Sequence, residues 1–229
     1  ATSADTITSA QTKSGLTNAQ ISGTTATQTP VEVTFGDCCQ RINSSVCSGW
    51  TQLTSITISD SVTALQNPSN NRAFYNCCRV EKLNIGSGIT SINGILMYQV
   101  GSSANTKPDL DLSMNNGLTL SNTVFHYCNF NKVKLPKNLS LSGTVFERSK
   151  INSLSFGNNT VISSGMPFNF TEISVVNLNN VVSIGNGAFN SSYGYTDIDI
   201  PSSVEYIGNN VFYNSGNTST LTSVTLNYT

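Results

Sequence analysis

Apolar and polar positions follow one short cycle, seen most clearly in residues 195–226. Ile198 and Ile200 alternate with aspartates, which predicts a short strand with one apolar face. Pro201 ends that strand, because proline has no N–H group to donate to a sheet ladder. A turn rich in glycine and asparagine and a polar loop follow, and the cycle then starts again.

The same cycle recurs along most of the chain. Phenylalanines mark it at intervals of 21 to 23 residues, at Phe125, Phe146, Phe168, Phe189 and Phe212. A strand position marks it independently, at Ile58, Ile85, Leu112, Leu135, Phe156, Leu178, Ile200 and Leu226. This period lies in the range of leucine-rich-type solenoids. One unit cannot bury its own apolar face, so the pattern predicts a solenoid of stacked repeats with a shared core.

The repeat, roughly L-x-x-I-x-I-P-x-x-V-x-x-I-G-x-x-A-F-x-x-C, resembles the BspA-type leucine-rich repeat. The clearest copies are Ile198 to Phe212, Val176 to Phe189 and Leu53 to Cys77. The resemblance implies a β-rich superhelix with a parallel sheet and short helical or 3-10 turns. It also implies that the aromatic position forms the structural core, at Phe74, Phe125, Phe146, Phe168, Phe189 and Phe212.

The chain departs from this pattern at several positions. Leu96 or Met97 stands where one unit should have phenylalanine, and the cysteine after phenylalanine is kept only at Cys77 and Cys128. We expect these two cysteines to be buried free thiols.

The expected organisation is a Thr/Ser-rich arm or linker over residues 1–30 and a solenoid of about eight repeats over 31–229, the last of them incomplete. The arm contains few large apolar residues, namely Ile7, Leu16 and Ile21. Either the arm is a linker, or these residues form an N-terminal cap or contact a neighbouring molecule.

Two insertions interrupt the repeats, at Gln66–Arg72 and Tyr98–Pro108. Insertions in a solenoid bulge from one face and often carry binding residues. The candidate partner-binding residues are therefore Asn67, Asn70, Arg72, Tyr98 and Lys107.

Composition narrows the function classes. The net charge is −1 and only 10% of residues are charged, so nothing indicates a nucleic acid or an anionic membrane as partner. No run is long and apolar enough to cross a bilayer. Abundant Ser, Thr, Asn and Gly are common in proteins exposed outside the cell, which favours an extracellular or cell-surface location.

The sequence offers little catalytic or metal-binding chemistry. Adjacent cysteines lack the spacing of a zinc site, and the only histidine, His126, has no nucleophile or acid at a motif spacing. We therefore expect no catalytic residue, metal or cofactor. In an oxidising location a disulfide could form within one set of cysteines, Cys38, Cys39, Cys47 and Cys78, with a pairing that the sequence leaves open.

The family resemblance implies a non-enzymatic surface or secreted protein that binds a host or matrix protein, or another cell. The alternative is a structural subunit that self-assembles end to end into a filament or fibre. In that case the N-terminal arm and an open C-terminal strand edge would join neighbouring copies of the chain.

Overall fold

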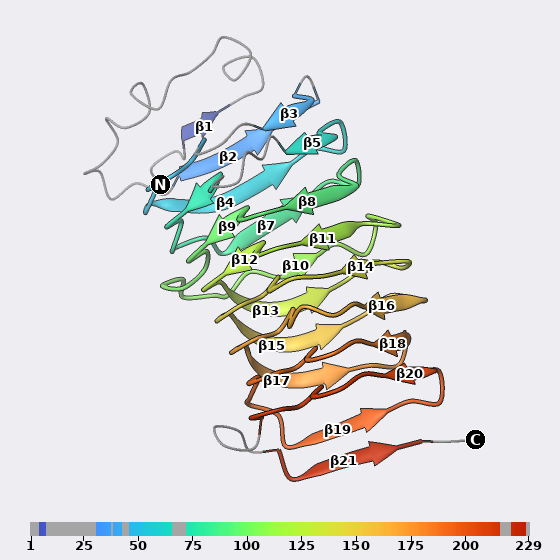
Figure 1. Ribbon diagram of the computed structural model, residues 1–229. Helices are drawn as coiled ribbons and strands as arrows, with labels where there is room; N and C mark the ends of the chain where they lie inside the picture. Colours follow the sequence, from blue (N-terminus) through green and yellow to red (C-terminus); the bar gives the residue numbers. More distant parts are fainter. Residues whose placement is uncertain are drawn as a thin grey trace.

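The computed structural model describes residues 5–7, 31–37, 39–42, 46–65, 72–215 and 221–227. These residues form a β-solenoid in which successive turns stack along one axis (Figure 1). Every pairing between the named strands is parallel and joins one turn to the next. The predicted repeat solenoid with parallel sheets is therefore confirmed.

The longest strands form what we call the first face. It comprises β1 (Asp5–Ile7), β2 (Val31–Phe35), β4 (Leu53–Ile58), β7 (Lys82–Ile85), β10 (Leu110–Asp111), β13 (Asn129–Lys134), β15 (Lys150–Ser155), β17 (Glu172–Asn177), β19 (Asp197–Ile200) and β21 (Ser223–Leu226). Their hydrogen bonding divides the face into three sheets, β1-β2-β4-β7, β10-β13-β15-β17 and β19-β21.

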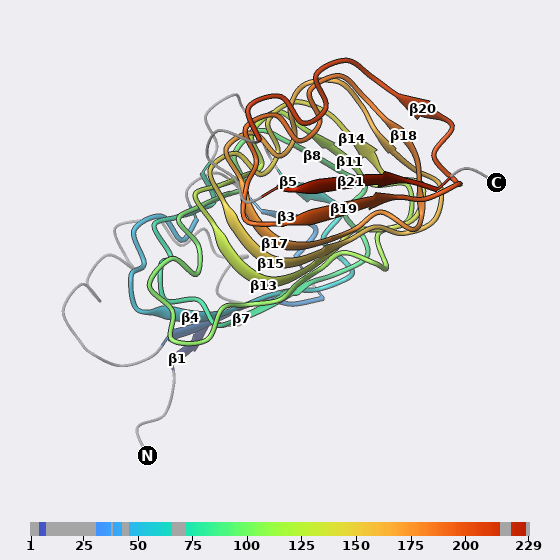
Figure 2. The same ribbon diagram turned by 90° about the horizontal axis from the view of Figure 1, so that it is seen from below.

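Two further series complete each turn. The second face comprises β3 (Arg41–Ile42), β5 (Ala64–Leu65), β8 (Ser91–Asn93), β11 (Thr119–Ser121), β14 (Ser140–Leu141), β16 (Thr160–Ile162), β18 (Val181–Ile184) and β20 (Tyr206–Ile207). The third side has the short strands β6 (Phe74–Tyr75), β9 (Met97–Tyr98) and β12 (Phe125–His126), followed by turns. Viewed from below, the turns largely superpose, with β13, β15 and β17 across the interior from β11, β14 and β18 (Figure 2).

Alternation of side chains decides which residues enter the core. In β19, Ile198 and Ile200 are buried whereas Asp197 and Asp199 are exposed, as the period-two pattern predicts. Ile200 lies opposite Leu226 of the next strand, so the strand position of the repeat is in register between turns.

The aromatic position forms a continuous column. Five phenylalanine rings stack one on the next along the chain, at Phe125, Phe146, Phe168, Phe189 and Phe212. The centroids of successive rings are 5.0, 5.5, 5.0 and 5.6 Å apart. Phe74 and Met97 continue it in register with Phe125, so Met97 takes the phenylalanine position in its turn. All are fully buried except Phe212, which is partly buried at the end of the column.

A second column accounts for the serine and threonine residues that stand where the repeat pattern has cysteine. Three residues after the aromatic position, the buried side chains include Cys77, Cys128, Ser149, Thr171, Ser192 and Ser215. The hydroxyls of Ser149, Thr171 and Ser215 donate to the carbonyl of the phenylalanine one turn earlier, at 2.7 to 2.9 Å. Serine or threonine therefore replaces cysteine without leaving a polar group unsatisfied.

The expected helical or 3-10 turns are wrong for the described residues, none of which is helical. Two residues after the aromatic position, the backbone is left-handed in turn after turn. The φ angles at this position lie between 51° and 57°, at Asn76, Gln99, Tyr127, Arg148, Phe170, Ser191 and Asn214. A left-handed residue cannot continue a right-handed helical turn, so each corner is a tight turn instead.

The two ends of the stack differ. Residues 5–7 of the N-terminal arm pair with β2 and extend the first face, while the positions of Leu16 and Ile21 lie outside the described residues. At the other end, Val224 and Leu226 of β21 are 44% and 47% exposed.

Candidate functional site

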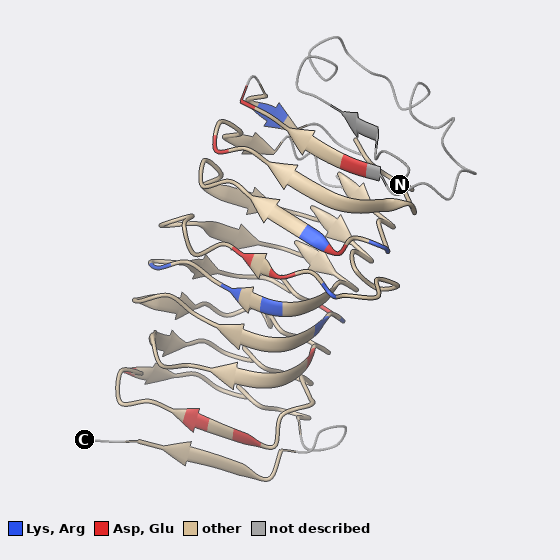
Figure 3. Ribbon diagram, turned by 180° about the vertical axis from the view of Figure 1, so that it is seen from behind, with Lys and Arg blue, Asp and Glu red and all other residues tan. Residues whose placement is uncertain are grey.

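The first face is a polar surface built on a buried core. In β13 the side chains of Phe130 and Val133 are buried, while Lys132 and Lys134 are exposed. The side of the sheet that faces solvent therefore carries polar side chains. Figure 3 shows the charged residues of this face on neighbouring strands.

Contacts between turns fix these polar side chains. The amide of Asn131 donates to Asp109 at 2.8 Å, and Lys134 forms an ion pair with Asp111 at 3.0 Å. Burial alone would raise the pKa of Asp111, but hydrogen bonds from Ser113 and Lys134 outweigh it, and the pKa is lowered. These groups are largely exposed, so the contacts order the surface more than they stabilise the fold.

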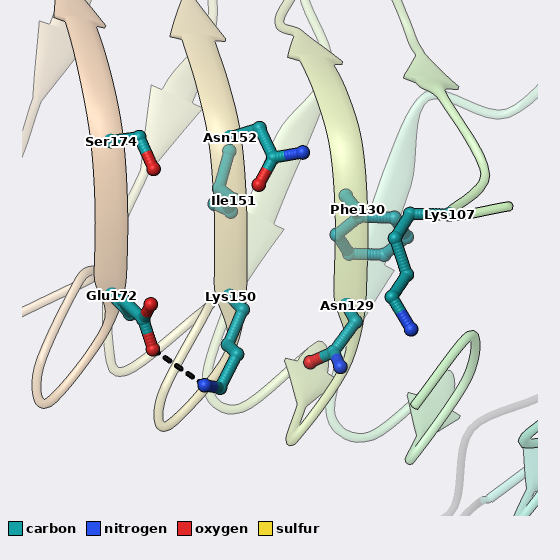
Figure 4. Close-up of a pocket in the computed structure, with 8 residues that line it drawn as sticks. All are labelled: Lys107, Asn129, Phe130, Lys150, Ile151, Asn152, Glu172 and Ser174. Atoms are coloured by element: carbon teal, nitrogen blue, oxygen red, sulfur yellow. Dashed lines mark ion pairs between the residues drawn. The ribbon is translucent and has the colours of Figure 1, made fainter. Parts of the chain in front are cut away.

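A shallow pocket of about 80 Å³ lies where β13, β15 and β17 begin (Figure 4). Lys150 and Glu172 form an ion pair at 2.7 Å at its edge. The hydrogen bond from Lys150 to Glu172 raises the pKa of the lysine, which keeps it protonated. The pocket is far smaller than the ~300–1,000 Å³ that usually encloses a small molecule. This part of the first face therefore suits a flat macromolecular contact.

The structure brings together two of the five predicted loop residues. The guanidinium of Arg72 lies 5.0 Å from the ring of Tyr75 and 5.2 Å from that of Tyr98, and the two rings stack at 4.9 Å. Lys107 lies instead at the pocket of Figure 4, where its ammonium group donates to the carbonyls of Gly101 and Ala104. Asn67 and Asn70 lie outside the described residues.

The described cysteines are all free. Cys77 and Cys128 are buried free thiols, as expected. Cys39, Cys47 and Cys78 are also free, and Cys38 lies outside the described residues, so the disulfide expected in an oxidising location stays a prediction.

Two of the thiols contact backbone carbonyls. The thiol of Cys39 is directed to the carbonyl of Arg41 at 3.3 Å, and that of Cys77 to the carbonyl of Cys47 at 3.2 Å. Burial raises the pKa of the Cys47 thiol and, to about 12, that of Cys128, so both are neutral and unreactive at physiological pH.

His126 lies on the third side of the solenoid, where its ring stacks on Tyr127 at 4.5 Å. Burial lowers its pKa, which favours the neutral imidazole. Its Nε2 atom is enclosed without a hydrogen-bond partner among the described residues. Within the described part of the chain, no group of three His, Cys, Asp or Glu side chains could hold a metal ion.

Sequence reasoning missed Arg148, which lies between the rings of Tyr127 and Phe170, one turn to either side. The three residues occupy the same repeat position, two residues after the aromatic position. Aligning the turns on their phenylalanines could have revealed this column, because its members stack directly above one another.

A family model for the BspA type leucine rich repeat region matches residues 24–107 and 118–228 in six copies. The unmatched residues 108–117 include β10, where the hydrogen bonding of the first face breaks from β7. Searches of curated proteins and of solved structures gave no match. None of the described residues belongs to a helix long and apolar enough to cross a membrane.

Proposed function

Because the chain belongs to the BspA-type leucine-rich repeat family, we propose that it is a non-enzymatic, surface-exposed or secreted protein that binds a protein partner. The binding surface is the first face, and the partner is a matrix or host protein or a protein on another cell. Such binding amounts to adhesion when either partner is anchored to a surface.

The observation that supports this proposal most is the order of the polar side chains on the first face. One ladder runs from Asp109, directly before β10, to Asn131 in β13 and Asn152 in β15. Residues held in place before binding lose less conformational entropy when a partner docks. The strands beneath them are fixed by a fully buried core, so the face presents a rigid surface for recognition.

Charge reversal on the first face tests the proposal. The Lys132→Glu/Lys134→Glu variant is compared with wild type for binding to purified extracellular-matrix proteins by surface plasmon resonance, with serum albumin as the negative ligand. We expect at least one matrix protein to bind wild type and to lose at least about tenfold in affinity with the variant, because like charges across an interface repel.

A matched control carries the same charge change elsewhere. Arg41→Glu/Lys137→Glu alters two exposed residues, one on the second face and one in the turn after β13. Equal loss of binding in this control would attribute the effect to net charge and contradict the proposed face. Binding of no matrix protein, together with no binding to intact cells, would contradict adhesion itself.

The alternative function is end-to-end assembly, and a specific observation favours it. Residues 5–7 form a parallel strand at one end of the first face, and β21 exposes apolar side chains at the other. Parallel pairing of β21 with the β1 edge of a second copy would continue the sheet across molecules and cover those residues.

Concentration-dependent light scattering distinguishes the two functions. If copies assemble, the apparent mass rises with concentration, and both removal of residues 1–30 and Val224→Lys/Leu226→Lys abolish the rise. A mass that stays that of one chain at all concentrations would reject assembly and leave the adhesion proposal standing.

A further inference from the structure

The third side of the solenoid carries a run of aromatic and arginine side chains that we call the aromatic ridge. It comprises Arg72, Tyr75, Tyr98, Tyr127, Arg148 and Phe170. Tyr98 lies 4.9 Å from Tyr75 and 5.5 Å from Tyr127, so the ridge is continuous across consecutive turns. It occupies a different side of each turn from the strands of the first face.

Arg148 packs between two rings of this ridge. Its guanidinium carbon lies 5.8 Å from the ring centroid of Tyr127 and 5.2 Å from that of Phe170. All three residues have left-handed backbone, with φ of 55°, 57° and 51°, so their side chains leave the stack at equivalent places. Rings on adjacent turns therefore contact the guanidinium without using its N–H groups.

The N–H groups of Arg148 are only partly used among the described residues. Its Nε atom forms a long ion pair with the Glu147 carboxylate at 3.8 Å, which is beyond hydrogen-bond distance, and no described residue accepts a hydrogen bond from its other nitrogens. The side chain is 49% exposed. A guanidinium that packs on aromatic rings and still has N–H groups open to solvent suits bidentate binding of a carboxylate.

Arg72 supplies a second cation on the same ridge, also packed on aromatic rings. Tyr75, Tyr98, Tyr127 and Arg148 come from four consecutive turns, and strands in neighbouring turns are about 4.8 Å apart. Because the guanidinium of Arg72 is almost equally far from Tyr75 and Tyr98, it lies between their two turns. The two arginines are thus separated by roughly 12 Å along the stack. Carboxylates four residues apart on an extended peptide are about 13 Å apart, because each residue rises about 3.3 Å.

We propose that the aromatic ridge is a docking surface for an extended acidic segment of a protein partner. Two carboxylates four residues apart bind Arg72 and Arg148. A side chain between them contacts Tyr127, and a side chain beyond the second carboxylate contacts Phe170; these rings are 37% and 47% exposed. The exposed rings favour a peptide over a sulfated glycan, because a glycan of that kind gains its affinity from clustered cations and leaves apolar surface uncovered.

The test uses a fluorescein-labelled nonapeptide of threonine and valine with two glutamates four positions apart, titrated with the whole chain by fluorescence anisotropy. We expect saturable binding that weakens with added salt, as charge-assisted contacts at a surface do. Arg148→Gln and Arg72→Gln should each weaken binding at least about fivefold, and a peptide with glutamines in place of the glutamates should bind at least about tenfold more weakly.

Two further variants separate docking from a structural role. Arg79→Gln changes an exposed arginine that is bonded to Gln52 instead of an aromatic ring, and it should leave the affinity within twofold. Phe170→Asn removes one ring from Arg148 and places asparagine, which tolerates left-handed backbone well, at φ 51°. It should preserve the melting temperature while weakening peptide binding about threefold.

Three results would overturn the proposal. One is the absence of saturable peptide binding by wild type at millimolar concentrations. Another is an equal loss of affinity in Arg79→Gln and Arg148→Gln. The third is tighter binding of a heparin oligosaccharide than of the peptide, with the same sensitivity to Arg148→Gln. None of them bears on the first face, so adhesion through that face could fail or hold independently.

Discussion

Replacing Phe189 by alanine tests the physical basis of the fold, because this ring lies within the aromatic column. It is fully buried and stacks on Phe168 at 5.0 Å and on Phe212 at 5.6 Å, with interplanar angles of 9° and 17°. Phe189→Ala removes both stacking contacts and leaves a cavity between two turns.

The expected loss follows from two contributions. Losing the buried ring costs about 2 kcal/mol in transfer free energy, since a fully buried phenylalanine is worth roughly 1.5–3 kcal/mol. A cavity of about 100 Å³ adds about 2 kcal/mol at about 24 cal/mol per Å³. The backbone around Phe189 is bonded to both neighbouring turns and resists collapse, as in the bond from its N–H to the carbonyl of Val211 at 2.9 Å. We therefore expect the free energy of unfolding to fall by about 4 kcal/mol.

Urea unfolding followed by circular dichroism measures this loss, and Tyr213→Ala is the matched control. Tyr213 is 57% exposed one turn further on, so its truncation should cost less than about 1 kcal/mol. Hydrogen exchange should show the destabilisation of Phe189→Ala concentrated in the adjoining turns, because repeats contact only their neighbours. Equal losses in the two variants would refute the view that the stacked aromatic column supports the solenoid.

Three further predictions concern polar and thiol groups. Ser149→Ala should lower the free energy of unfolding by about 1–3 kcal/mol in urea titrations, because it removes a buried donor and leaves the N–H of Cys128 without its 3.0 Å acceptor. Ser149→Cys, which restores the family residue, should cost less, and the reverse order would contradict this account. Cys77 and Cys128 should resist alkylation at pH 8 until denaturant is added, as counted by mass spectrometry, because burial raises the pKa of both thiols. Rapid labelling of the folded chain would show that the turns open readily. Hydrogen bonds from the backbone N–H and then the hydroxyl of Ser87 lower the pKa of Asp60 below its usual 3.8. Its contribution to stability is therefore present at neutral pH and lost as the pH falls through the folded value. The stability difference between wild type and Asp60→Asn should shrink from pH 6 to pH 3, and a constant difference would exclude the linkage.

The sequence predicted the repeat because the period is a property of every turn. Residues such as Phe146, Phe168 and Ile200 each contact the equivalent residue one turn away, so the spacing along the chain maps directly onto the stack. The prediction of helical turns failed at the corners, where non-glycine residues such as Arg148 and Phe170 are left-handed. Arginine and phenylalanine are not among the residue types enriched in left-handed backbone, such as Asn and Asp, so the local sequence did not predict this conformation.

The candidate site was harder to predict than the fold. Arg72 and Tyr98 were chosen because they lie in insertions, and only the stacking of turns placed them together with Tyr75. The sequence alone did not show how the cysteines are placed either, since only the structure revealed that Cys39 contacts the carbonyl of Arg41 and that the described cysteines are free.

By itself, the sequence determined that apolar residues recur with the period of one turn, and this requires a stack with a common interior, because no single turn can bury them. Only the tertiary structure decided which surface residues become neighbours. Residues 21 to 30 positions apart meet on adjacent turns. Whether they meet as an ion pair, as paired amides or as a guanidinium packed on a ring depends on register and corner geometry. Core positions repeat in every turn, so a single sequence is enough to predict them. A surface contact joins one particular pair of residues, and it can be identified only when the turns are aligned in space.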